Sequence, residues 1–117
     1  MTLSVAHITF DCRDAATLSR FWSEALGRPV DEGAQPFFAS IGFGAPGPEP
    51  AWLFLQVPED KAAKNRMHLD LTADDRPAEI ARLVALGATH VGDHDEWGHR
   101  WSVLRDPEGN EFCVASR

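Results

Sequence analysis

The chain lacks a long apolar segment, and this absence excludes one class of protein. No apolar run approaches the roughly 18 residues that a membrane-spanning helix needs. The first residues, Met1 to His7, show no basic stretch followed by a long apolar one, so we expect no secretory signal. The sequence therefore predicts a cytoplasmic protein without a membrane partner.

Basic residues are also scarce. The 117 residues include 11 Lys and Arg against 18 Asp and Glu, which gives a formal net charge of −7. A surface of this sign repels nucleic-acid phosphates and anionic lipid headgroups, so neither is an expected partner. The expected partner is therefore a small molecule, together with any cation that an acidic cleft attracts.

Cysteine is limited to Cys12 and Cys113, and neither lies in a Cys-x-x-Cys pair. A thioredoxin-like redox motif is thereby excluded, and two thiols in a cytosolic protein are expected to be reduced. Apolar residues make up 44% and charged residues 25% of the chain, as in an ordinary globular protein. The length fits one domain.

What the sequence does contain is an internal repeat. Each copy starts with a histidine on an alternating strand, His7 or His68, continues with a helical pattern and closes on Leu-Gly at Gly27 or Gly87. Asp14 is suited to cap the first helix, and Gly27 to the left-handed residue that follows it. In the second copy, Pro77 fits the first helical turn. We interpret the two segments as a duplicated unit.

The remaining apolar segments have the pattern of strands, which gives an α+β fold class. These strands are expected at residues 37–43, 51–57, 90–92, 100–105 and 111–115, with turns at 44–50 and 106–110. We predict one domain, 1–117, in which module one (1–57), a linker (58–65) and module two (66–117) follow one another. Two βαβββ modules would form a curled, eight-stranded mixed sheet around one cleft.

This order of motifs resembles the vicinal oxygen chelate superfamily, which includes glyoxalase I, bleomycin-resistance proteins, fosfomycin-resistance enzymes and extradiol dioxygenases. The resemblance rests on the two histidine strands, the Leu-Gly helix ends and the closing Asp-Pro-Glu-Gly-Asn-Glu-Phe at residues 106–112. It covers essentially the whole chain. The segments 64–71 and 111–114 look like a subgroup called glyoxalase-like.

The resemblance implies a cleft metal that holds two oxygens of a substrate. Carried onto this sequence, His7 and His68 are the predicted metal ligands, and zinc, nickel or iron is the predicted ion. Cys113 occupies the position where metal-binding relatives usually carry glutamate, and Gln56 lies on the last strand of module one. The alternative is that both histidines are hydrogen-bonding groups without a metal.

Other candidate residues follow from alternation along the strands. Glu111 shares a strand face with Cys113 and is our candidate general base, against the alternative of a solvated residue. Cys113 is either a ligand-contacting group, a nucleophile or a small buried hydrophobe. Gln56 is either a specificity group or a strand-end side chain in water.

Aromatic residues near strand ends suggest walls for a flat organic ligand. Phe54 and Trp101 are the predicted ligand contacts, against the alternative that these aromatics pack in the core or at a dimer contact. The segment 93–99 is dense in titratable groups and is expected to be an exposed hairpin tip that could act as a lid. Lys61, Lys64 and Arg66 form a basic cluster suited to a carboxylate or phosphate.

Two functions are therefore open. The first is a glyoxalase-like protein that binds a small organic molecule and acts on it as a metal-dependent lyase, isomerase or dioxygenase. The second is a protein of the bleomycin-resistance type that sequesters its ligand unchanged. A homodimer is expected, because small relatives often pair and short sheets expose their edges.

Overall fold

The computed structural model describes residues 3–44 and 47–117. The chain divides into two compact units, Met1–Asp60 and Lys61–Arg117, and the boundary falls inside the predicted linker. The beginning of the N-terminal segment and the middle of the predicted turn 44–50 lie outside the described residues. Among the helices described, none has the length and apolar character needed to cross a membrane.

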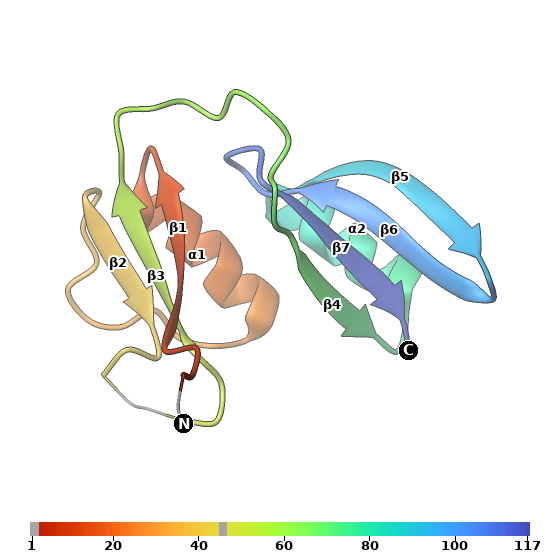
Figure 1. Cartoon of the computed structure of the whole chain (residues 1–117), viewed down its shortest axis with the longest axis horizontal. Helices are drawn as coiled ribbons and strands as arrows, with labels where there is room; N and C mark the ends of the chain where they lie inside the picture. Colours follow the sequence, from red (N-terminus) through yellow and green to blue (C-terminus); the bar gives the residue numbers. More distant parts are fainter. Residues whose placement is uncertain (1–2, 45–46) are drawn as a thin grey trace. The chain divides into compact units, whose positions relative to one another are not determined.

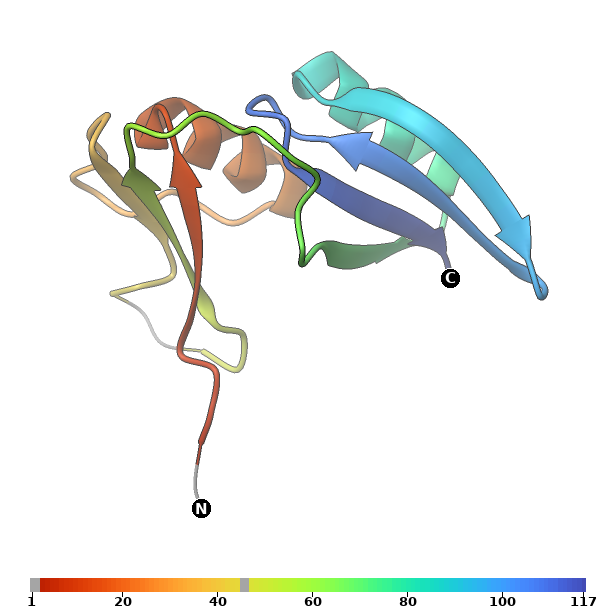
Figure 2. The ribbon, with the colours of Figure 1, turned by 45° about the horizontal axis from the view of Figure 1, so that its top comes forward.

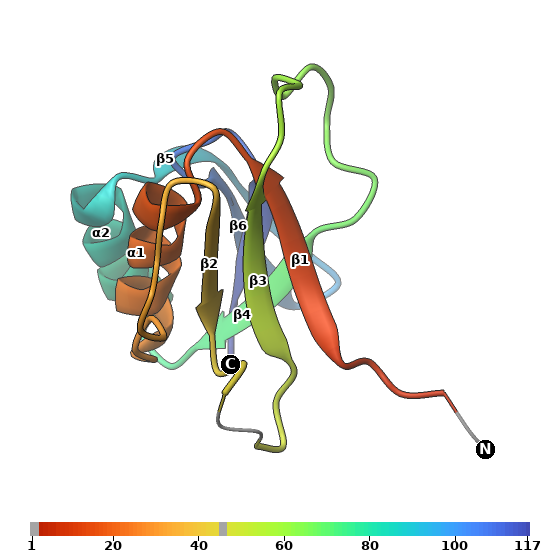
Figure 3. The ribbon, with the colours of Figure 1, turned by 90° about the vertical axis from the view of Figure 1, so that its left-hand side faces the viewer.

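Unit 1 is a three-stranded sheet covered by one helix. Its elements are β1 (His7–Cys12), α1 (Ala15–Leu26), β2 (Phe38–Ile41) and β3 (Ala51–Gln56). The strands are ordered β1-β3-β2, with β1 parallel and β2 antiparallel to β3. Helix α1 lies on one face of this sheet, where it contacts β2 and β3 (Figure 3).

Both ends of α1 confirm the local predictions. The Asp14 side chain accepts a hydrogen bond from the Thr17 N–H at 3.0 Å and so satisfies a backbone group that the helix leaves unpaired. Gly27 ends the helix with φ 68°, a left-handed conformation that costs a glycine little.

The core of unit 1 is aromatic. Trp22 on α1 is fully buried against the sheet, with ring centroids 5.6 Å from Phe10 and 5.2 Å from Trp52. Phe54 stacks on Phe10 at 5.3 Å. These four rings hold the helix to the sheet by burying large apolar surfaces and by tilted and stacked ring contacts.

Unit 2 has four strands and one helix. Its elements are β4 (Leu69–Ala73), α2 (Arg76–Leu86), β5 (Thr89–Glu96), β6 (His99–Arg105) and β7 (Glu111–Ser116). The order is β4-β7-β6-β5, with β4 parallel to β7 and the other neighbours antiparallel (Figure 1). As in unit 1, the first strand pairs in parallel with the last strand, which agrees with the predicted repeat.

Helix α2 covers one face of the unit 2 sheet (Figure 2). Beneath it lie buried side chains from the helix and from alternate positions on β6 and β7: Ile80, Leu83, Leu104, Phe112 and Val114. Arg76, at the start of α2, donates hydrogen bonds to the hydroxyls of Ser102 (2.6 Å) and Ser116 (2.9 Å), which ties the helix to both strands. Pro77 lies in the first turn, as predicted. The face opposite α2 has no helix of unit 2 on it.

Two details of the predicted architecture need correction. Among the described residues there are seven strands in two sheets, of three and four strands, instead of one eight-stranded sheet. The strand predicted at 90–92 is longer: β5 continues to Glu96, β6 starts at His99, and only Trp97 and Gly98 form the turn, so segment 93–99 is the exposed end of a hairpin, as predicted. Charged residues concealed this strand, because both faces of a two-stranded hairpin end can remain in water.

Candidate functional site

The open face of the unit 2 sheet carries a pocket of about 520 Å³. Strand alternation explains its walls, since every second residue of β6 and β7 points away from α2. The pocket also takes in the end of the linker and the tip of the β5–β6 hairpin. Its lining residues are Lys64, His68, Asp70, Leu71, Thr72, Trp97, His99, Trp101, Val103, Glu111, Cys113 and Ala115.

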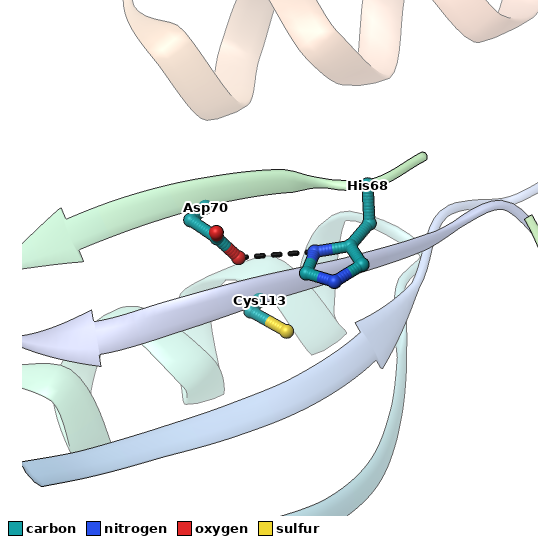
Figure 4. Close-up of side chains that lie close together, drawn as sticks. All are labelled: His68, Asp70 and Cys113. Carbon is teal, nitrogen blue, oxygen red and sulfur yellow. Dashed lines mark ion pairs between the residues drawn. The ribbon is translucent and has the colours of Figure 1, made fainter. Parts of the chain in front are cut away.

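His68, Asp70 and Cys113 line this pocket, and their side chains lie close together as a polar cluster (Figure 4). The parallel register places Asp70 directly opposite Cys113, and His68 shares the strand face of Asp70 because it lies two residues earlier. One nitrogen, oxygen or sulfur atom from each residue lies within 4.8 Å of the other two. Three different kinds of donor atom therefore converge on one point of the open face.

His68 and Asp70 form an ion pair within this cluster. The His68 Nδ1 lies 3.0 Å from the Asp70 Oδ1, and both side chains are exposed, by 40% and 68%. The other ring nitrogen of His68, Nε2, takes no part in this pair. Nε2 is therefore the position at which His68 can accept a proton or bind a metal.

The Cys113 thiol is held in its neutral form. Burial raises its pKa, and the neighbouring Asp70 raises the pKa further by its negative charge and by accepting the thiol hydrogen bond, while Lys64 opposes this. A reactive cysteine needs a lowered pKa and a nearby base that takes its proton. This upward shift of its pKa argues against the nucleophile hypothesis for Cys113.

Glu111 is engaged with the linker. It accepts a hydrogen bond from the Asn65 N–H at 2.9 Å, and Lys61 and Arg105 lie 3.3 and 3.7 Å from its carboxylate. Its side chain is only 11% exposed. Burial tends to raise the Glu111 pKa, but the Asn65 N–H, its own backbone N–H and Lys61 outweigh it, so the pKa is lowered. A general base works best with a pKa near the working pH. The pKa of the Glu111 carboxylate is instead shifted further below that pH.

An aromatic wall faces the polar cluster along β6 and the hairpin. Trp101 lies opposite His94 in the β5–β6 register, and the two rings stack with centroids 4.9 Å apart. His99 packs against the same indole at 5.3 Å. These contacts fix the Trp101 ring without burying it completely, so the pocket has a flat apolar surface available for stacking.

Trp97 stands at the hairpin tip, 91% exposed, and also lines the pocket. Trp97 and Gly98 both have positive φ, 54° and 73°, as in the tight two-residue turns that match the twist of a hairpin. Asparagine or glycine is preferred at such positions, and a bulky side chain is strained there. A large exposed aromatic in this conformation is poorly explained by folding alone.

The predicted site residues of unit 1 are distributed over both faces of its sheet. His7 is exposed and lines a separate hollow of about 310 Å³, where its ring meets Phe43 edge-on at 5.1 Å. Phe54 is fully buried in the aromatic core. Gln56, two residues along β3 on the face of Phe54, donates its amide to the Arg13 carbonyl at 2.8 Å.

Asp70 is a polar residue of the pocket that sequence reasoning did not select, whereas Lys64 was noted only as part of the basic cluster, and Trp97 and His99 only as part of segment 93–99. Asp70 had a usable signal, since the alternation His68-x-Asp70 puts both side chains on one strand face. Its position opposite Cys113 depends on the β4–β7 register, which the sequence does not state.

The donor set of the polar cluster fits a transition metal. Imidazole, carboxylate and thiolate are all zinc ligands, and sulfur favours zinc over the hard cations magnesium and calcium. Within unit 2, the geometry groups His68 with Asp70 and Cys113 as possible ligands.

Fold and pocket together define a class of α+β proteins built from repeated strand–helix–strand units, with a pocket on the open sheet face of the second unit. The model of the glyoxalase-like domain matches residues 7–115, and the chain belongs to this family. No curated protein matches it.

Solved structures share the fold at low sequence identity. A glyoxalase/bleomycin resistance protein/dioxygenase family enzyme from Burkholderia phytofirmans is 18% identical, with a TM-score of 0.78 over 97% of this chain and 98% of its own. The fosfomycin resistance protein FosX from Mesorhizobium loti is 17% identical (TM-score 0.73; 100% and 94% covered). A lactoylglutathione lyase from Agrobacterium tumefaciens is 15% identical (0.67; 98% and 94%).

Proposed function

We propose that this glyoxalase-like protein binds a small organic molecule with a flat apolar part in the pocket of unit 2. The observation that carries the proposal is the pairing of the Trp97–Trp101 aromatic wall with the His68–Asp70–Cys113 cluster across one pocket. Stacking on the indoles would supply affinity, and the polar cluster would orient oxygens of the ligand. Small-molecule sites commonly combine apolar walls with a few orienting polar groups in this way.

Two modes of action follow from such a site. Turnover as a lyase, isomerase or dioxygenase is supported by the His68–Asp70 pair, which leaves Nε2 able to take a proton from the ligand. Sequestration of an unchanged ligand is supported by Glu111, whose carboxylate is committed to the linker and is not available as a second base. A divalent metal at His68 and its neighbours in the pocket would serve either mode by polarising ligand oxygens.

The test uses 1-naphthol and 1-naphthoate as flat probes in the presence of EDTA, so that metal plays no part. We expect both probes to shift the indole N–H resonances of Trp97 and Trp101 in nuclear magnetic resonance spectra, with naphthoate the tighter because the Lys64 ammonium lies at the pocket. Trp101→Leu should weaken both probes. Binding that leaves these two indoles unchanged would refute the proposed site.

The mode of action is decided by what is released. After incubation with candidate ligands, a sequestering protein returns the bound molecule with its mass and isomeric form unchanged. A catalyst converts more than one equivalent, and His68→Gln should remove that turnover while naphthoate still binds.

A further inference from the structure

We propose that the ligand of the unit 2 pocket is a flat molecule with a single carboxylate, and that the Lys64 ammonium binds this carboxylate. The inference rests on the proposed function, since it concerns the same pocket, and it adds the chemical class of the ligand. It also reverses an expectation from composition, because a net charge of −7 by itself favours a cationic ligand.

Lys64 brings a positive charge to the pocket. Among the described residues that line the pocket, Lys64 is the one Lys or Arg. Its charge reaches the strand β7, since Lys64 acts to lower the pKa of the Cys113 thiol there. An ammonium group at this place attracts an anion by its charge and can donate hydrogen bonds to it.

Within residues 3–44 and 47–117, Lys64 makes no hydrogen bond or ion pair. The nearby Lys61, by contrast, lies 3.3 Å from the Glu111 carboxylate. Acidic residues outnumber basic ones by 18 to 11, so the missing partner of Lys64 does not reflect a shortage of acids. The charge of Lys64 is therefore available to a bound molecule.

The acids that line the pocket are already engaged. Asp70 pairs with His68 at 3.0 Å. Glu111 accepts a backbone hydrogen bond from the linker and has Lys61 at 3.3 Å. Neither carboxylate neutralises Lys64, so an anionic ligand does not have to displace a protein group from the ammonium.

The same two acids limit the charge of the ligand. Asp70 and Glu111 both line the pocket, so a second negative charge on the ligand meets repulsion that one ammonium does not offset. A carboxylate carries one charge, whereas a phosphate monoester carries about 1.5–2 charges at neutral pH. The indoles of Trp97 and Trp101 supply the flat contact for the rest of the molecule. Together these features favour a flat monocarboxylate.

The test compares probes that share one ring system and differ in charge: 1-naphthoate, neutral 1-naphthol, 1-naphthyl phosphate and the cation 1-naphthylmethylammonium. Each is titrated into the whole chain by calorimetry at neutral pH in EDTA. We expect naphthoate to bind about fivefold more tightly than naphthol at low salt, as an exposed ion pair allows. Naphthyl phosphate should bind more weakly than naphthoate, and the ammonium probe most weakly. Added salt should reduce the preference for naphthoate, because it screens exposed charges.

Variants assign this preference to Lys64. Lys64→Gln should abolish the preference for naphthoate over naphthol, and Lys64→Arg should keep it because the charge remains. Arg82→Gln is the matched control: it removes an equal charge from α2, on the other face of the sheet, and should keep the preference. Asp70→Asn shifts the balance the other way and should increase the preference, because one negative charge leaves the pocket. Circular dichroism checks that each variant is folded.

Three results would overturn the inference: equal affinities of the wild type for naphthoate and naphthol, tightest binding of the phosphate or the ammonium probe, or a preference for naphthoate that persists in Lys64→Gln. The wild-type comparison needs no variant and decides the question even if a variant fails to fold.

This inference and the proposed function fail separately. If naphthoate and naphthol shift the Trp97 and Trp101 indole resonances but bind with equal affinity, the selection by charge is refuted and the pocket stands. If naphthoate binding depends on Lys64 but leaves both indoles unchanged, the aromatic pocket is refuted and the carboxylate contact stands.

Discussion

Glu111→Gln separates a structural role of this residue from a catalytic one. In the structure the Glu111 carboxylate accepts the Asn65 N–H at 2.9 Å and pairs with Lys61 and Arg105. Glutamine keeps the shape and can still accept the backbone hydrogen bond, but it leaves both cations without their partner. The linker should therefore be held less tightly to the start of β7.

The expected loss of stability can be worked out from these contacts. A hydrogen bond to a charged acceptor contributes about 1.5–3 kcal/mol and a neutral one about 0.5–1.5 kcal/mol, so the change costs about 1 kcal/mol. The two ion pairs, which share a carboxylate only 11% exposed, add up to about 1 kcal/mol more. A loss of about 1–2 kcal/mol lowers the Tm by roughly 3–10 °C in a protein of this size.

The assay is denaturant unfolding and calorimetry of Glu111→Gln beside Glu79→Gln. Glu79 makes an exposed pair with Arg82 on α2, so its variant should lose less than about 0.5 kcal/mol. Naphthoate binding should persist in both variants. Wild-type stability in Glu111→Gln would refute the structural role, and the loss in this variant of a turnover that the wild type shows would restore the general-base hypothesis.

Three further outcomes are expected. Trp22→Ala should cost about 3–5 kcal/mol in denaturant unfolding, because it empties the fully buried centre of the unit 1 core; a loss below 1 kcal/mol, roughly what an exposed substitution costs, would contradict that packing. Trp97→Asn should raise stability by about 1 kcal/mol, since asparagine tolerates positive φ, while weakening naphthoate binding; unchanged binding would remove Trp97 from the site. Burial raises the Asp31 pKa, but the Ser40 hydroxyl, two backbone N–H groups and Arg28 outweigh it and lower the pKa. Asp31 therefore stabilises the fold above its unfolded pKa of about 3.9, and the stability advantage of wild type over Asp31→Asn should vanish as the pH falls through the lower folded pKa; an advantage that grew in acid would contradict this sign.

Local signals in the sequence predicted the helices well. Asp14 caps the start of α1 and Gly27 ends it, as the sequence predicted. The apolar stripe of the helix correctly placed Trp22 in the core. The length of β5 was underestimated, because β5 reads Thr-His-Val-Gly-Asp-His-Asp-Glu and is mostly exposed. Strands that bury neither face carry little hydrophobic alternation, so their pairing is recognised only once the partner strand is in place.

The sequence by itself determined the α+β class, the repeat, the helix ends and the family, since each depends on residues close together in the chain or on an ordered set of motifs. It also singled out His68, Trp101, Glu111 and Cys113, which line one pocket. Tertiary structure alone decided what these residues contact: that Asp70 lies opposite Cys113 and that Glu111 is committed to Asn65. Contacts between strands depend on register over more than 40 residues of chain, and strand alternation gives a face but not the neighbour on it.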